Sequence, residues 1–140
     1  MDRAHWQQLS RERVKDAELL LGGGQWAGAY YLAGYAVECG LKSCVLAFVE
    51  RNPDVIFLDR KYSEKCWTHD IGVLVALADL QSSRVADSLA NPALEVNWGI
   101  VLTWSEKARY ELIGEARARR LHEAVAHDPN GVLPWIRMRW

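Results

Sequence analysis

The longest apolar stretch of the chain runs from residue 26 to residue 49, WAGAYYLAGYAVECGLKSCVLAFV, and carries two charged residues, Glu38 and Lys42. These two lie four positions apart, so on a helix they share one face and can form a structural ion pair. Small side chains recur at steps of three and four, at Ala29, Ala33, Ala36, Gly40, Ser43 and Ala47. Such a stripe allows a second helix to approach closely. Because larger apolar residues cover the remaining surface, the pattern predicts the central helix of a bundle.

A membrane span is the alternative for this stretch, since about 20 apolar residues suffice to cross a bilayer. Glu38 and Lys42 at the middle of a span would each cost about 2.5–3.5 kcal/mol. The rest of the chain is amphipathic and charged, and residues 1–16, MDRAHWQQLSRERVKD, are too polar for a signal peptide. We therefore expect a core helix of a soluble protein and no membrane partner.

The apolar periodicity on either side of this stretch predicts further helices. Residues 3–21 form an amphipathic helix that ends at three consecutive glycines, so it should lie antiparallel to the core helix. Residues 52–68 form a polar connection after Asn52-Pro53. Thr68, His69 and Asp70 then offer helix-start side chains for residues 71–80.

The second half of the chain continues the helical pattern. A shorter helix is predicted over residues 83–90, and residues 93–104 read as helix or irregular structure, because a lone strand has no partner. Ser105 is expected to cap a last long helix, which ends at residues 128–131. The tail, VLPWIRMRW, follows. The prediction is a single all-α domain over residues 1–140.

Composition narrows the class of protein. With 140 residues, 50% of them hydrophobic, and seven tryptophans, the chain is long and apolar enough for one core. The net charge of −1 gives no global attraction to nucleic acid, so any anion-binding surface must be local. The three cysteines, Cys39, Cys44 and Cys66, fit a reducing cytoplasm. Cys66 and His69 alone are too few ligands for zinc, so we expect no metal and no cofactor.

Four short motifs follow one another along the chain in a characteristic order. They are the helix end DAELLL, the segment GQWAGAYYLAGYAVECGLKSCVLA, the helix start THDIGVLVALA and the segment WSEKARYE. This order resembles the HEPN family of small helical proteins. The resemblance implies an up-and-down bundle of four to five helices, usually homodimeric and often associated with a minimal nucleotidyltransferase.

Catalytic members of that family are metal-independent endoribonucleases, often toxins, that carry an Arg, four to six further residues and then a His. Arg117 with His122 and Arg120 with His127 both match this spacing. The polar residue that commonly follows the Arg in the family is missing after both arginines. The resemblance therefore also admits a non-catalytic member.

Helix geometry ranks the two pairs. On a continuous helix Arg117 and His122 point about 140° apart, whereas Arg120 and His127 differ by only about 20°. Arg109 falls on the stripe of Arg120, provided that Gly114 does not break the helix. Arg120 with His127 is thus the candidate catalytic pair, and Arg117 with His122 is the alternative.

These side chains suit RNA chemistry. A His would transfer a proton at the 2′-hydroxyl or the leaving oxygen, and an Arg would stabilise charge at phosphorus. Arg109, Arg117 and Arg120 form the candidate ligand-binding set. In the tail, Trp135, Arg137, Arg139 and Trp140 either clamp a nucleotide or dock on the protein's own surface.

Glu38 needs a partner because it lies in an apolar helix. Arg117 on the last helix is the expected partner across the bundle, with Lys42 or Arg109 as alternatives. His69 is expected to be a capping or buried hydrogen-bonding residue.

The sequence thus predicts a cytoplasmic HEPN-like domain that is homodimeric through its small-residue stripe or its last helix. Its predicted function is that of a non-catalytic module that binds a nucleotide, RNA or a nucleotidyltransferase partner. The alternative is a toxin-like, metal-independent endoribonuclease with an Arg–His pair at a dimer cleft.

Overall fold

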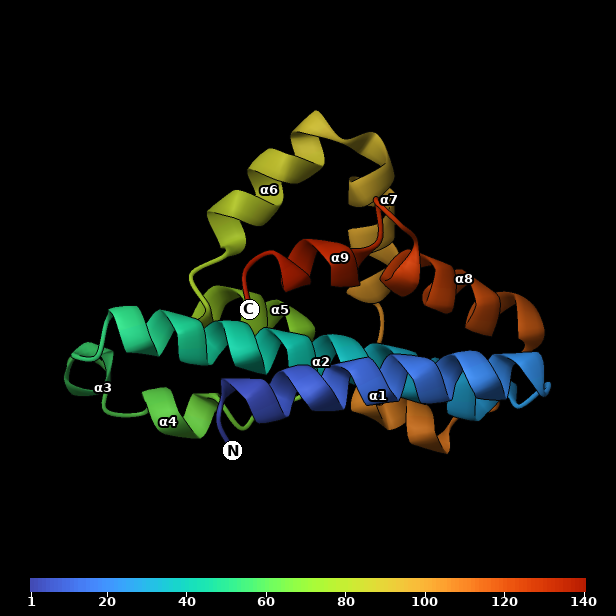
Figure 1. Cartoon of the computed structure of the whole chain (residues 1–140), viewed down its shortest axis with the longest axis horizontal. Helices are drawn as coiled ribbons and strands as arrows, with labels where there is room; N and C mark the ends of the chain where they lie inside the picture. Colours follow the sequence, from blue (N-terminus) through green and yellow to red (C-terminus); the bar gives the residue numbers. More distant parts are fainter.

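Two long antiparallel helices form the base on which the other elements gather (Figure 1). The structure, a computed structural model, describes residues 1–140 and consists of nine α-helices and one 3-10 helix, without a β-strand. Helices α1 (Arg3–Gly22) and α2 (Trp26–Arg51) make the most extensive contact between any two elements. The all-α prediction is confirmed. The helices outnumber the four to five expected because the connections contain short helices of their own.

The chain reverses direction between α1 and α2 in a tight glycine turn. Asp2 caps α1 by accepting a hydrogen bond from the amide of His5. At the other end, the amide of Gly23 donates to carbonyl oxygens of the last helical turn. Gly24 has a φ of 73°, a left-handed conformation that favours glycine. The helix predicted over residues 3–21 is therefore confirmed, one residue longer than expected.

The small-residue stripe of α2 is covered by other parts of the same chain. Ala33 and Ala36 are fully buried, and Ser10 of α1 donates a hydrogen bond to the carbonyl oxygen of Ala36 at 2.7 Å. Gly40 lies against the side chains of Ile136 and Ser10. Because these neighbours occupy the stripe, it is not available as a dimer surface.

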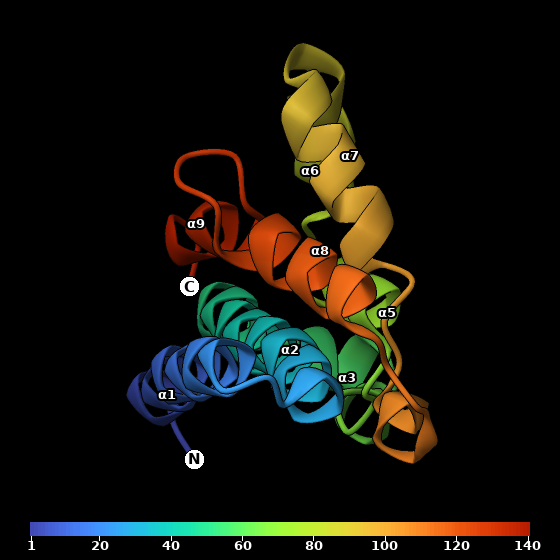
Figure 2. The same ribbon diagram turned by 90° about the vertical axis from the view of Figure 1, so that its right-hand side faces the viewer.

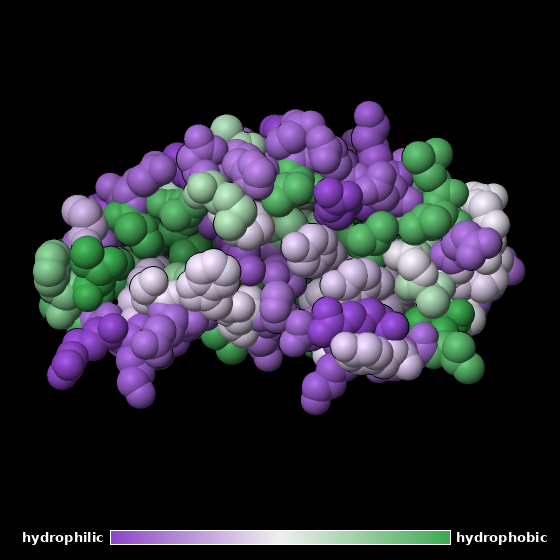
Figure 3. Space-filling model, turned by 90° about the horizontal axis from the view of Figure 1, so that it is seen from below, coloured by the Kyte–Doolittle hydropathy of each residue, from purple (hydrophilic) through white to green (hydrophobic).

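The predicted polar connection after α2 contains two short helices, α3 (Val55–Leu58) and α4 (Tyr62–Lys65). Helix α5 (Ile71–Leu77) begins at Asp70, whose carboxylate accepts a hydrogen bond from the amide of Val73. Hydrophobic side chains gather at the α3–α4 end of the lower face (Figure 3). Exposed apolar residues in this region include Ile56, Phe57, Leu58 and Trp67.

Helices α6 (Gln81–Ala90) and α7 (Pro92–Val101) form a hairpin that projects from the base (Figure 2). The segment 93–104 is helical over most of its length. Asn91 caps α7 by accepting a hydrogen bond from the amide of Leu94, and Pro92 occupies the first helical position, where its fixed φ is favourable.

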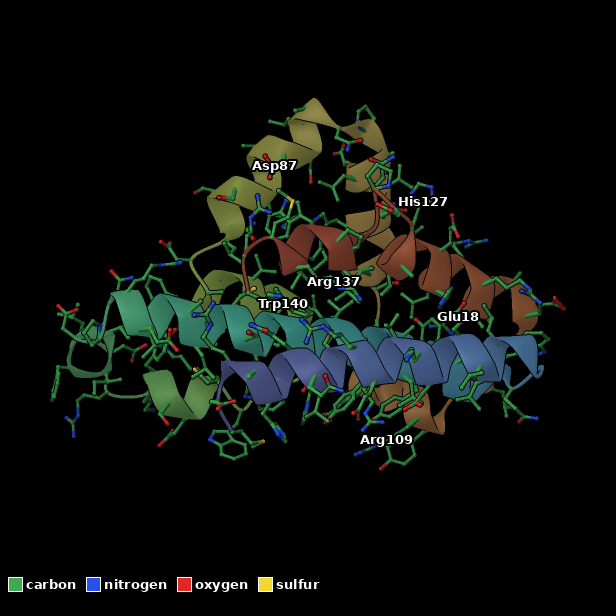
Figure 4. All side chains as sticks on the ribbon, in the orientation of Figure 1. Glu18, Asp87, Arg109, His127, Arg137 and Trp140 are labelled. Atoms are coloured by element: carbon green, nitrogen blue, oxygen red, sulfur yellow. The ribbon has the colours of Figure 1, made fainter.

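The last long helix expected after Ser105 is wrong. Ser105 caps only a short 3-10 helix, η1 (Glu106–Tyr110), and α8 (Glu115–Ala126) begins separately after Gly114. Gly114 has extended backbone angles, with a φ of −86° and a ψ of 170°. These angles interrupt the helical backbone, so η1 and α8 do not form one continuous helix. Helix α9 (Val132–Arg137) follows. Arg109 therefore does not continue the stripe of Arg120, and it lies on the opposite side of the molecule from His127 (Figure 4).

Helix α2 is long and apolar enough to cross a membrane, with a mean hydropathy of 1.5 over its most apolar window. Within the fold, 67% of that window is buried by the rest of the chain. This burial is typical of a core helix, and a single helix of this kind is weak evidence for a membrane span.

The close contact at Gly34 generates a stability prediction. An ideal Cβ atom at Gly34 would lie 2.2 Å from Trp104 Cε2, and Trp104 is buried. Gly34→Ala should therefore displace the indole and lower the free energy of unfolding by about 1–3 kcal/mol. In α7, Gly99 has no atom within 4 Å of such a Cβ, so Gly99→Ala should be neutral or raise the free energy by about 0.5–1 kcal/mol. Urea denaturation of both variants checks this difference, and an undiminished stability of Gly34→Ala would contradict it.

Candidate functional site

A buried carboxylate at the middle of α2 organises the first cluster of predicted site residues. Glu38 is 1% exposed, and its Oε1 lies 2.9 Å from Lys42 Nζ and 2.9 Å from His69 Nδ1. His69 Nε2 lies 3.2 Å from Glu106 Oε2. This chain of polar contacts fastens α2 to the start of α5 and to η1. The imidazole thus bridges two carboxylates that come from different elements.

The partner of Glu38 is Lys42, not the expected Arg117. Arg117 instead reaches Tyr30, which precedes Glu38 by eight residues on α2, or about 12 Å along the helix axis. Lys42 Nζ also lies 5.1 Å from the ring centroid of Trp6. The second oxygen of Glu38 is buried without a hydrogen-bond partner. Because the cluster joins three elements, its geometry is that of a structural clamp.

The cysteines of α2 lie in the same core and are not reactive groups. Burial raises the pKa of Cys39 to about 12, and the neighbouring Glu38 carboxylate adds to this shift. Burial likewise raises the pKa of Cys44 to about 12. Both thiols stay protonated at neutral pH, which disfavours thiolate chemistry.

A first cleft, the α7–α8 cleft, has a volume of about 300 Å³ and contains two of the three predicted ligand-binding arginines. Arg117 Nη1 lies 2.9 Å from Glu111 Oε2, and Nη2 donates to Tyr30 Oη at 3.2 Å. The guanidinium carbon is 4.7 Å from the Tyr30 ring centroid. The hydrogen bonds to Glu111 and Tyr30 raise the pKa of Arg117. Arg120 lies one helical turn further along, exposed and without an ion-pair partner.

A second cleft, the two-histidine cleft, has a volume of about 290 Å³ and contains His122 and His127. It is also lined by Glu18 of α1 and Arg137 of α9 (Figure 4). His127 Nδ1 accepts a hydrogen bond from the amide of Asn130 at 3.3 Å. This leaves Nε2 facing Glu123 at 3.9 Å.

The structure therefore separates both predicted Arg–His pairs. Arg117 and Arg120 line the α7–α8 cleft, whereas His122 and His127 line the two-histidine cleft. His127 is the C-cap of α8, with a ψ of 131°, so its backbone leaves the helical periodicity on which the expected alignment with Arg120 depends. Arg109 lines neither cleft.

Sequence reasoning missed Glu18 and Arg137 as neighbours of the two histidines. Arg137 is a candidate binding residue of the tail, but nothing in the sequence pattern places it near α8. Glu18 is one of several charged residues on the polar face of α1, and only the packing of α8 and α9 on that helix distinguishes it.

The C-terminal segment docks on the protein's own surface. Trp135 is buried, and its Nε1 donates to Asp87 Oδ2 at 2.8 Å. Arg139 Nη2 reaches the same oxygen at 2.8 Å. The ring of Trp140 lies between Arg11, at 4.9 Å, and Arg137, at 5.8 Å. Of the two alternatives for the tail, docking is the one that the structure shows.

No protein-family model, curated protein or solved structure matches this chain. No group of three or more His, Cys, Asp or Glu side chains is arranged to hold a metal ion. The fold and its clefts thus define the class of protein as an all-α domain with basic and histidine-bearing grooves on either side of α8.

The cluster of Glu38, Lys42, His69 and Glu106, here called the Glu38 clamp, leads to a second stability prediction. Glu38→Ala leaves Lys42, which is only 12% exposed, without its counter-charge and removes the anchor of His69. The free energy of unfolding should fall by about 3–5 kcal/mol. Thermal denaturation measures the loss, with Glu64→Ala, an exposed carboxylate of α4 outside any ion pair, as the matched control. Equal melting temperatures for the two variants would show that the clamp does not stabilise the fold.

Proposed function

We propose that this protein is a non-catalytic, HEPN-like module that binds a nucleotide or single-stranded RNA in the α7–α8 cleft. The observation that carries the proposal is the convergence of Arg117 and Arg120 beside the face of Tyr30. Planar guanidinium groups bind phosphate oxygens in bidentate fashion. Arg120 has no protein counter-charge, so a ligand anion is the partner that would satisfy it.

The remaining walls of the α7–α8 cleft suit a nucleotide. Val96 and Ile100 present apolar surface, and the hydroxyl of Thr103 lies at the rim. A volume of about 300 Å³ falls at the lower end of the range for small-molecule sites. Arg117 is held in place by Glu111 and Tyr30 before any ligand arrives, which reduces the entropy lost on binding.

Arg120→Ala tests this proposal. Arg120 is exposed and unpaired, so the substitution leaves the fold intact. The substitution should weaken the binding of labelled single-stranded RNA by about 1–3 kcal/mol. The slope of binding against salt concentration should fall by about one. Fluorescence anisotropy at low and high salt measures both quantities. The matched control is Arg60→Ala, an exposed arginine between α3 and α4. Equal affinities for the two variants would exclude the α7–α8 cleft.

An endoribonuclease is the second candidate, and the two-histidine cleft is the observation that favours it. His122 and His127 could act as acid and base, and Arg137 could stabilise charge at phosphorus. Two carboxylates, those of Glu18 and Glu123, line the same cleft. Their negative charge opposes an RNA backbone, so we place binding ahead of cleavage.

We expect no RNA cleavage above background by the wild-type protein in EDTA. Gel electrophoresis of a single-stranded RNA after incubation checks this expectation. Metal-independent cleavage that leaves a 2′,3′-cyclic phosphate, and that falls about 10²–10⁴-fold in His122→Ala or His127→Ala, would make the protein an enzyme. Arg119→Ala, which removes an exposed arginine paired with Glu115, serves as the control for loss of charge on α8.

We also propose a cytoplasmic homodimer, or a complex with a nucleotidyltransferase, as the working assembly. The support is the apolar surface at the α3–α4 end of the lower face (Figure 3). Phe57 is 81% exposed and Trp67 73% exposed. Clustered exposure of large apolar side chains is typical of an interaction surface.

A further inference from the structure

Four arginines from distant parts of the chain line a third cleft, the arginine cleft, of about 400 Å³. They lie at the start of α1, at the end of α2 and in the C-terminal segment, namely Arg3, Arg51, Arg137 and Arg139. No acidic side chain lines the cleft. In a chain with a net charge of −1, this is a strong local concentration of positive charge.

Two of these guanidinium groups already have carboxylate partners. Arg3 Nη1 lies 3.0 Å from Glu50 Oε2, and Arg3 Nη2 donates to the main-chain oxygen of Trp140. Arg139 pairs with Asp87 at 2.8 Å. Arg51 and Arg137 have no carboxylate within ion-pair distance. In addition, Arg3 Nε is buried without a hydrogen-bond acceptor. The cleft therefore keeps uncompensated charge and an unused donor.

The N-terminus of α6 adds a separate electrostatic contribution. This ten-residue helix begins after Leu80, which lines the arginine cleft and provides no side-chain cap. The first amides of a helix lack partners within the helix, and the helix dipole makes this end positive. Both effects add positive potential beside the cleft, next to Leu80.

Arg137 is repelled in the absence of a ligand by a guanidinium group beside the cleft, that of Arg11. Burial lowers the pKa of Arg137, and the nearby Arg11 guanidinium lowers it further. Both arginines also flank the ring of Trp140. An anion bound to Arg137 would relieve this repulsion.

We propose that the arginine cleft binds a di- or triphosphate group, carried by a nucleotide or by the 5′ end of an RNA. Arg51 and Arg137 bind its oxygens. A single carboxylate would neutralise only one of the two unpaired guanidinium groups, whereas a chain of phosphates neutralises both. The proposal uses no residue of the α7–α8 cleft and stands independently of the function proposed above.

Isothermal titration of the full chain with inorganic triphosphate tests the proposal. We expect saturable binding that weakens about tenfold or more in Arg51→Gln and in Arg137→Gln. Neither guanidinium group is in an ion pair, so neither substitution leaves a carboxylate unpaired and both variants keep the fold. Arg60→Gln is the control and should bind as the wild type does. An absence of saturable binding, or unchanged affinity in both cleft variants, would overturn the proposal.

Further titrations identify the source of the phosphates. Tighter binding of ATP than of inorganic triphosphate would support a nucleotide. Tighter binding of an RNA with a 5′-triphosphate than of the same RNA with a 5′-hydroxyl would support an RNA end. The 5′-hydroxyl RNA also separates this proposal from the previous one, because it lacks the group that the arginine cleft recognises.

Discussion

The close approach of other elements to the small-residue face of α2 is the constraint on which the rest of the structure depends. A hydrogen bond from Ser10 to the carbonyl oxygen of Ala36 joins α1 to this face. Ile136 of α9 packs on Gly40 of the same face, and Trp104 packs on Gly34 on the opposite face of the helix. Larger side chains at these positions would hold α1, α9 and the segment before η1 away from α2. The three clefts form between elements whose positions follow from this packing.

Polar contacts on the other side of α2 hold the start of α5 and η1, which do not pack on the small residues of that helix. Glu38 is buried at the centre of the helix and is tolerated because Lys42 and His69 both reach its Oε1. The other ring nitrogen of His69 contacts the carboxylate of Glu106 of η1. Removing one partner of such a cluster leaves an uncompensated buried charge, so the stability lost on its removal exceeds that of a surface ion pair.

Helix α8 separates two of the clefts of the protein. Its side toward α7 presents Arg117 and Arg120, and its side toward α1 and α9 presents the two histidines. Within one copy of the helix, the arginines and the histidines therefore line different clefts. Phosphate recognition needs only the arginines, which is why the geometry supports binding more directly than cleavage. The arginine cleft, which is lined by residues from both ends of the chain, adds a second group of arginines that suits a negatively charged ligand.

The sequence by itself determined the all-α class, the antiparallel α1–α2 pair and the central position of α2, because apolar periodicity and glycine turns are local signals. The capping role of Asp70 and the ion pair of Glu38 with Lys42 were also within reach, since both involve residues three or four positions apart. Only the tertiary structure decided that η1 and α8 are separate, because Gly114 permits a break but does not require one. It also decided which arginines share a cleft. Arg3, Arg51 and Arg137 are far apart along the chain, and only the packing of α9 against the α1–α2 pair brings their charges together.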